Sequence, residues 1–133
     1  MRPFPDATVS RWLKKQSIQH LYTTWINIAE IQRGLDRLPN GKRKEALKLS
    51  FIGFVTHAFS SRVLSFDQQS ARNYAALSTK REQAGYHVDP VDMMIAATAQ
   101  SRSFAVATRN TADFTCCGIE LINPWDLEII RKP

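Results

Sequence analysis

Three acidic residues have the type and the placement along the chain that metal-dependent chemistry requires: Glu30, Asp92 and Asp113. Each of them follows a strand-like run or stands near the beginning of a predicted helix. If these segments meet at one edge of a sheet, the carboxylates repel one another unless a cation neutralises them. Ligand sets made only of oxygen favour Mg²⁺ or Mn²⁺ over Zn²⁺. Such ions activate water and stabilise the charge on a transferring phosphoryl group, so the three acids indicate nuclease chemistry.

Each acid, taken alone, also has a structural explanation. Asp92 in the first turn of a helix would stabilise that helix through its dipole. Asp113 would cap a turn through a local side-chain hydrogen bond, and Glu30 alone is better explained as a solvated glutamate in the first turn of a helix. Only the three acids together favour a metal site.

The segment FAVATRNTADF, residues 104–114, is the one around which we expect the site to form. Its apolar beginning is typical of a buried strand, and polar residues from Thr108 onward follow directly. In open α/β sheets, ligands bind at the edge where such strands end. We expect the Thr108 hydroxyl and the Asn110 amide to lie at this edge. Phosphate contacts are expected from Arg109 in this segment, from Arg33 in an earlier helix, or from the basic cluster Lys42-Arg43-Lys44.

Strand-like and helix-like segments alternate along the chain. The strands are predicted at His20–Trp25, Arg62–Phe66, Phe104–Thr108 and Glu120–Ile122. The helices are predicted from Asp6 over about ten residues, after Asn27, over Lys42–Phe59, from Asp67 to Gly85, over Pro90–Ser101 and in the C-terminal tail. This alternation predicts an α/β fold, a parallel sheet flanked by helices, in a single domain over residues 1–133.

Several residues predict where these helices begin and end. Asn27 and Asp67 are expected to be N-caps, and Gly85 is expected to close the helix that Asp67 opens. Pro90 is tolerated in a first turn, where its missing N–H costs nothing. Gly34 lies inside a predicted helix at a cost of about 1 kcal/mol, and we expect it to leave room beside Glu30.

Composition narrows the classes of function. The 133 residues include 18 Lys and Arg against 12 Asp and Glu, and the net charge of +6 favours a polyanionic partner such as nucleic acid. No apolar stretch is long enough for a membrane span, and no glycine-rich phosphate loop or G-x-S-x-G elbow occurs. The adjacent Cys116 and Cys117 are poorly placed for a mutual disulfide, so we expect free thiols and a cytoplasmic location.

Four blocks of sequence carry a resemblance to a known family. They are NIAEIQRGLDRLPNGKRKEAL, SFDQQSARNYAAL, VDMMIAATAQ and ATRNTADF with GIELINPW. In this order they resemble the PIN-domain family, and more closely the VapC/FitB-type toxins of type II toxin–antitoxin pairs. The resemblance covers nearly the whole chain.

The resemblance implies a parallel α/β fold and an Mg²⁺-dependent ribonuclease that is usually dimeric and is silenced by a cognate antitoxin. It places the family's acids on Glu30, Asp92 and Asp113, its hydroxyl on Thr108, and Asn110 beside the same site. The family's first strand, with its Asp-Thr-Asn motif and first catalytic aspartate, has no counterpart here. We therefore expect either a start upstream of Met1 or an impaired protein that binds antitoxin or RNA without cleaving.

Overall fold

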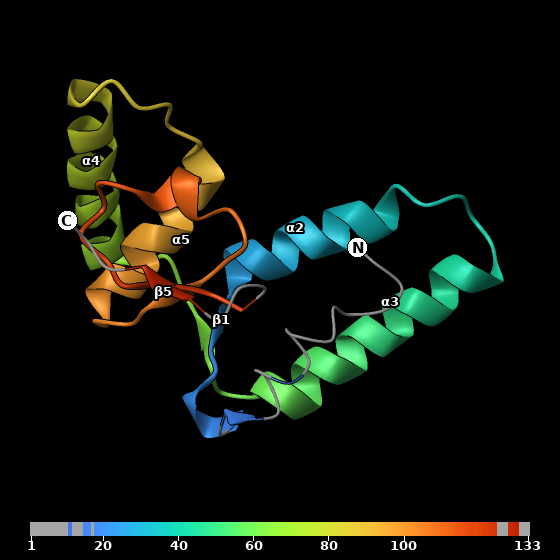
Figure 1. Ribbon diagram of the computed structural model, residues 1–133. Helices are drawn as coiled ribbons and strands as arrows, with labels where there is room; N and C mark the ends of the chain where they lie inside the picture. Colours follow the sequence, from blue (N-terminus) through green and yellow to red (C-terminus); the bar gives the residue numbers. More distant parts are fainter. Residues whose placement is uncertain (1–10, 12–14, 17, 125–127, 131–133) are drawn as a thin grey trace. The chain divides into compact units, whose positions relative to one another are not determined.

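The computed structural model describes residues 11, 15–16, 18–124 and 128–130 (Figure 1). These residues form two compact units, one containing the elements from η1 to β2 and the other the elements from α4 to β5. The helix predicted after Asp6 lies mostly outside the described residues. None of the helices in the described ranges combines the length and apolar character that a bilayer span needs.

The unit from η1 to β2 contains a two-stranded parallel sheet with two helices between its strands. Strand β1 (Thr23–Thr24) pairs with β2 (Val63–Leu64), and Thr23 lies opposite Val63. The 3₁₀ turn η1 (Ile18–His20) precedes β1; the helix α2 (Trp25–Asp36), the helix α3 (Lys42–Phe54) and the π-helical turn η2 (Val55–Phe59) lie between the strands. Helices α2 and α3 run in opposite directions (Figure 1).

Helix α2 begins two residues before the predicted cap. The hydroxyl of Thr24 accepts a hydrogen bond from the backbone N–H of Asn27 at 3.0 Å, so Thr24 is the N-cap and the prediction for Asn27 was wrong. A β-branched residue that ends a strand can cap the next helix without an intervening loop. Consequently Glu30 lies in the second turn of α2, not in the first.

The space next to Gly34 is open. A Cβ atom added at Gly34 would meet no atom within 4 Å, so no packed neighbour requires this glycine, and its role in leaving room beside Glu30 stays a prediction. Ile28 and Leu35 are the buried residues of α2, whereas Ile31 from the predicted apolar stripe is exposed.

The unit from α4 to β5 contains the larger core. Helix α4 (Gln68–Gln83) packs along α5 (Pro90–Ser101), and β3 (Val106–Ala107), the 3₁₀ turn η3 (Thr111–Phe114), β4 (Leu121–Asn123) and β5 (Glu128–Ile130) follow. Strand β4 lies between β3, to which it is parallel, and β5, to which it is antiparallel. The apolar side chains of its core come from α4, α5, η3, the strands β3 and β4, and the loop after η3: Leu77, Met93, Ala96, Ala97, Ala99, Val106, Phe114, Cys117, Ile119 and Leu121.

Local signals fix the ends of α4 and α5 as the sequence predicts. Asp67 caps α4 by accepting from the backbone N–H of Ser70 at 3.0 Å, a bond that lowers the pKa of this carboxyl. At the other end, Tyr86 N–H donates to Arg81 O and Gly85 N–H donates to Glu82 O, which is the Schellman arrangement. Gly85 has φ +83°, where a glycine avoids the strain that a Cβ would cause.

The C-terminal tail is a strand at residues 128–130, so the predicted helical tail was wrong there. Glu128, Ile129 and Ile130 pair with Asn123, Ile122 and Leu121. Two β-branched residues favour this conformation, and pairing satisfies backbone groups on the second edge of β4 that a helical tail would leave open.

Candidate active site

Asp92 is placed at the beginning of α5 by a cap that the preceding residues supply. The carboxylate of Asp89 accepts from the backbone N–H of Asp92 at 3.0 Å, and Pro90 occupies the first turn. Asp92 itself is half-buried, while Ala96 and Ala99 further along α5 are buried in the core. Asp92 is therefore not the cap of its helix, and its carboxylate is available for another task.

Asp113 is placed by the turn that follows β3. The Thr108 N–H donates to Ile122 O at 2.9 Å and ends the pairing with β4, and the Thr108 hydroxyl accepts from Asn110 N–H at 3.1 Å. The Asp113 N–H then donates to Asn110 O at 3.1 Å within η3. The next side chain, Phe114, is 4% exposed and anchors this turn in the core.

These two elements bring the Asp92 and Asp113 carboxyl groups together. Burial raises the pKa of Asp92 to about 6, and the negative charges of Asp89 and Asp113 contribute to the same shift. A hydrogen bond to the Asp113 side chain raises the pKa further, while the positive charge of Arg81 opposes the rise. The Asp113 carboxyl group thus disfavours ionisation of Asp92, as expected where two acids lie close together.

The other predicted residues take different positions. Thr108 supports the turn of Asp113 through its hydroxyl, whereas the Asn110 side chain makes no cap hydrogen bond to η3. Arg109 is exposed in the same turn. Glu30 and Arg33 belong to the other unit, where both are exposed on α2 and lie three positions apart, on one side of that helix.

The chemistry of the paired carboxyl groups fits a hard divalent cation. Both offer only oxygen, and Mg²⁺ is commonly held by one or two carboxylates together with water molecules. A cation would also remove the repulsion that raises the pKa of Asp92. Among the residues that the structure describes, no group of three or more His, Cys, Asp or Glu side chains is arranged to hold a metal ion. Within the α4–β5 unit the candidate ligands are therefore a pair.

Two residues near this pair were missed by the sequence analysis. The signal for Asp89 was present, since an aspartate directly before Pro90 is a common N-cap pattern. Arg81 carries no comparable signal, because an arginine in the last turn of a polar helix is ordinarily solvated. Only the folded chain shows that Arg81 is buried, with 3% of its surface exposed.

Comparison with known proteins identifies the family to which the chain belongs. The family model described as "PIN domain" matches residues 3–115. The VapC ribonuclease Y4jK of Sinorhizobium fredii is 39% identical over 122 residues, which are 92% of this chain and 87% of the relative. Toxin FitB of Neisseria gonorrhoeae is 34% identical over 125 residues, 94% of this chain and 90% of FitB.

Solved structures agree with the sequence relatives. The structure of FitAB bound to an IR36 DNA fragment matches with a TM-score of 0.90 and 35% identity, covering 96% of this chain and 89% of that one. VapBC-5 from Mycobacterium tuberculosis, a member of the VapBC family of toxin–antitoxin systems, matches with a TM-score of 0.65 and 27% identity, over 77% of this chain and 80% of that one. With parallel strands flanked by helices and matches that span most of its length, the chain belongs to the PIN-domain family, in the group that contains VapC and FitB.

Proposed function

We propose that this protein is a metal-dependent endoribonuclease and the toxin of a type II toxin–antitoxin pair. The observation that carries the proposal is the Asp92–Asp113 pair, held at the start of α5 and just after β3 in a chain 39% identical to a VapC ribonuclease. Two carboxyl groups that repel each other in this way form a binding site for a cation, because a cation removes the repulsion. The basic composition, with a net charge of +6, suits a polyanionic substrate such as RNA.

In this proposal, Asp92, Asp113 and Glu30 would hold Mg²⁺ or Mn²⁺. When bound, such an ion would activate water and neutralise charge on the phosphoryl group. Thr108 keeps the turn of Asp113 in place through the hydrogen bond from Asn110 N–H. Arg109 and Arg33 offer planar guanidinium groups, which can bind phosphate oxygens through two hydrogen bonds.

We also propose a cognate antitoxin and a second copy of the chain as partners, in a cytoplasmic setting. VapBC-5 is by name a member of a family of toxin–antitoxin systems, FitB is by name a toxin, and this chain is similar to both. Three apolar side chains of α3 are more than half exposed, at 70% for Leu49, 56% for Ile52 and 59% for Phe54. Leu49 and Ile52 lie three positions apart on one side of α3, and exposed apolar side chains that adjoin in this way are typical of protein–protein contact surfaces.

Cleavage of a labelled RNA over a titration of Mg²⁺ tests the catalytic proposal. We expect turnover that EDTA abolishes and that Asp92→Asn reduces by about 100-fold or more, because the variant removes a metal ligand. Asp36→Asn is the matched control, since Asp36 is an exposed acid whose ion pair with Lys48 lies in the other unit.

Two outcomes would contradict the proposal. Equal cleavage with EDTA and with Mg²⁺ would assign the activity to a contaminant. Antitoxin binding without turnover at any Mg²⁺ concentration would support the alternative, an impaired PIN domain that binds antitoxin or RNA without cleaving.

A further inference from the structure

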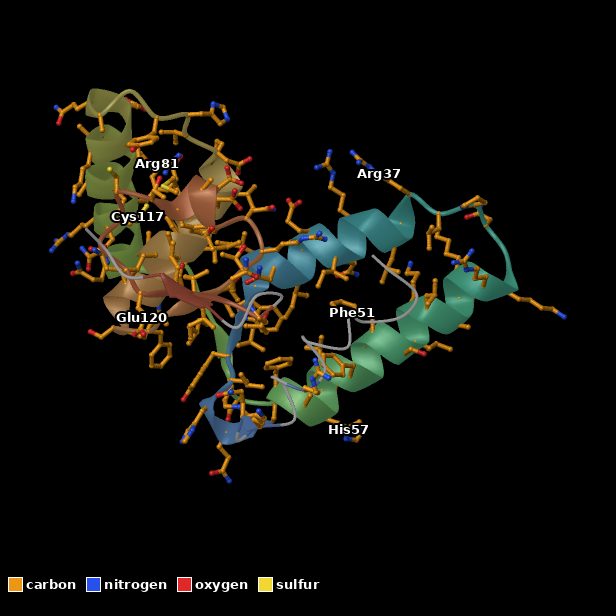
Figure 2. All side chains as sticks on the ribbon, in the orientation of Figure 1. Arg37, Phe51, His57, Arg81, Cys117 and Glu120 are labelled. Atoms are coloured by element: carbon orange, nitrogen blue, oxygen red, sulfur yellow. The ribbon has the colours of Figure 1, made fainter. Side chains whose placement is uncertain are left out.

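Arg81 is the charged side chain that the described part of the chain buries most completely, with 3% of its surface exposed. A buried charge is unfavourable unless hydrogen bonds or an opposite charge compensate it. No ion pair of Arg81 with a carboxylate is found among the described residues, so hydrogen bonds must supply the compensation. Figure 2 shows this side chain within the unit formed by α4 to β5.

The hydrogen bonds of Arg81 reach two separate loops. Its Nε and Nη2 atoms donate to His87 O at 3.0 and 2.6 Å. Its Nη1 atom donates to Thr115 O at 2.7 Å and, at longer range, to Thr115 Oγ1 at 3.3 Å and Ala112 O at 3.5 Å. The guanidinium also lies 5.1 Å from the centre of the Tyr86 ring. One planar group thus joins the loop before α5 to the turn after β3.

Both loops carry an acid of the candidate site. His87 lies two residues before Asp89, the cap that sets the start of α5 and with it the position of Asp92. Ala112 precedes Asp113 directly, and Thr115 follows it by two residues. A guanidinium that holds the backbone on both sides therefore fixes the two carboxyl groups relative to each other, because its fork of donors is rigid.

We propose that Arg81 is a positioning residue that holds Asp92 and Asp113 at the separation a divalent cation requires, and thereby sets the metal affinity of the site. The inference rests on the proposed function of the same site. Arg81 itself touches neither substrate nor metal in this assignment. It acts through the carbonyl oxygens of the two loops.

A matched control exists at the opposite end of the same helix pair. Arg102 also joins α4 to α5, since its Nη1 atom donates to Ser70 Oγ at 3.3 Å and to Ser101 Oγ at 2.8 Å, and its Nη2 atom lies 3.5 Å from Asp67 Oδ2. Its hydrogen bonds to Ser70, Ser101 and Asp67 lie at the C-terminal end of α5, whereas Asp92 lies at the beginning of that helix. A change at Arg102 should therefore cost stability without changing the geometry of the acids.

The experiment compares Arg81→Lys, Arg81→Met and Arg102→Lys with the wild-type full chain. Calorimetric titration with Mn²⁺ measures metal affinity, thermal unfolding without metal measures stability, and RNA cleavage is followed over a range of Mg²⁺ concentrations. We expect Arg81→Lys to weaken Mn²⁺ binding by about 10-fold or more, the usual loss when a group that orients metal ligands is removed. At saturating Mg²⁺ its kcat should return to within a few-fold of wild type, while Arg102→Lys lowers the Tm and leaves the Mn²⁺ affinity unchanged.

Arg81→Met separates positioning from charge. If Arg81 acted only as a nearby positive charge, its removal would strengthen Mn²⁺ binding and Arg81→Lys would change nothing. If Arg81 instead positions the two acids, both Arg81→Met and Arg81→Lys should bind Mn²⁺ more weakly than wild type. Should an Arg81 variant fail to fold, Thr115→Val removes the 3.3 Å contact of Arg81 with Thr115 Oγ1 and keeps the bond to Thr115 O, so no buried charge is left unpaired. A smaller weakening of Mn²⁺ binding is expected.

An Arg81→Lys protein, or in its place Thr115→Val, with wild-type Mn²⁺ affinity overturns the inference. Equal losses of affinity in Arg81→Lys and Arg102→Lys would do the same, because they would reflect stability alone. Failure of the proposed function is a different result, namely a wild-type protein that neither binds Mn²⁺ nor cleaves RNA.

Discussion

Among single residues, Asp92 occupies the least favourable position for a carboxylate. It is half-buried and faces two other acids, and only the positive charge of Arg81 opposes their effect. A neutral residue at position 92 would avoid this repulsion, yet the sequence has an acid there. Such a loss of stability is common where a site requires strain or charge for its function.

The pKa of Asp92 predicts how the stability of the metal-free protein depends on pH. Its folded-state pKa of about 6 lies above the value of about 3.9 that an unfolded chain shows. Between these values the folded protein binds more protons than the unfolded chain, so the free energy of unfolding contributed by this group falls as pH rises from about 4 to about 6. Above pH 6 the contribution of Asp92 to the free energy of unfolding stays at this lower value.

Urea unfolding in EDTA at several pH values tests this dependence. Asp92→Asn should lack this part of the decline and should exceed wild type at pH 8 by about 1 kcal/mol, a figure already reduced for solvent screening of a half-exposed group. Asp36→Asn should follow the wild-type curve. If the free energy of unfolding of wild type and of Asp92→Asn changed in parallel with pH, the pKa of Asp92 would not be raised in the folded protein.

At the scale of the elements, capping groups determine where the helices that carry the acids begin and end. Thr24, Asp67 and Asp89 each accept a hydrogen bond from a backbone N–H three residues further on. At the opposite end of α4, Gly85 reverses the chain so that Arg81 O can accept from Tyr86 N–H. The loop that leads to Asp92 therefore starts from a defined direction.

Two glycines of these elements should respond in opposite ways to the same substitution. Gly85→Ala forces a Cβ into a left-handed conformation, φ +83°, and should lower the free energy of unfolding by about 1 kcal/mol. Gly34→Ala meets open space inside α2 and should raise it by up to about 1 kcal/mol through helix propensity. Thermal or urea unfolding measures both, and a loss of stability in Gly34→Ala would show that Gly34 has a packing role after all.

At the scale of the whole molecule, the basic residues at the start of α3 are placed against the helix dipole. Lys42 and Arg43 are exposed at the positive end of this helix, where acidic residues would stabilise it. The neighbouring Lys44 donates to Asp36 O at 3.0 Å, and Lys48 forms an ion pair with Asp36 at 3.1 Å. Because Lys44 and Lys48 already contact Asp36, Lys42 and Arg43 are the better candidates among the basic residues of α3 for phosphate contacts.

RNA binding at several salt concentrations tests this role. The double variant Lys42→Gln, Arg43→Gln should bind RNA more weakly and with a smaller dependence on salt, by roughly one released counterion for each lost phosphate contact. Lys48→Gln is the control, because its partner is Asp36. An unchanged salt dependence in the double variant would assign these charges to a solvated face.

The single-domain organisation over residues 1–133 stays a prediction, and the sizes of the two cores suggest a test. Among the described residues of the η1–β2 unit only Thr24, Ile28 and Leu35 are buried, and α3 buries none. So small a core cannot offset the conformational entropy of folding alone. We therefore expect one cooperative transition in calorimetry, with equal calorimetric and van't Hoff enthalpies, and two separate transitions would contradict this expectation.

The sequence by itself determined the features that depend on near neighbours in the chain. Asp67, Gly85 and Pro90 mark helix ends because their hydrogen bonds or fixed dihedrals involve residues only a few positions away. The alternation of elements predicted parallel strands flanked by helices, which the pairs β1–β2 and β3–β4 confirm, and the quoted blocks predicted the PIN-domain family. The acid set that they suggest stays a prediction.

Only the tertiary structure decided which of these groups meet. Arg81 and Thr115 are 34 positions apart, and no local pattern shows that one will bury its guanidinium against the carbonyl oxygen of the other. The proximity of Asp92 to Asp113 is likewise a product of core packing around Met93 and Phe114. Contacts between distant segments depend on how a whole core closes, and residue spacing does not record that.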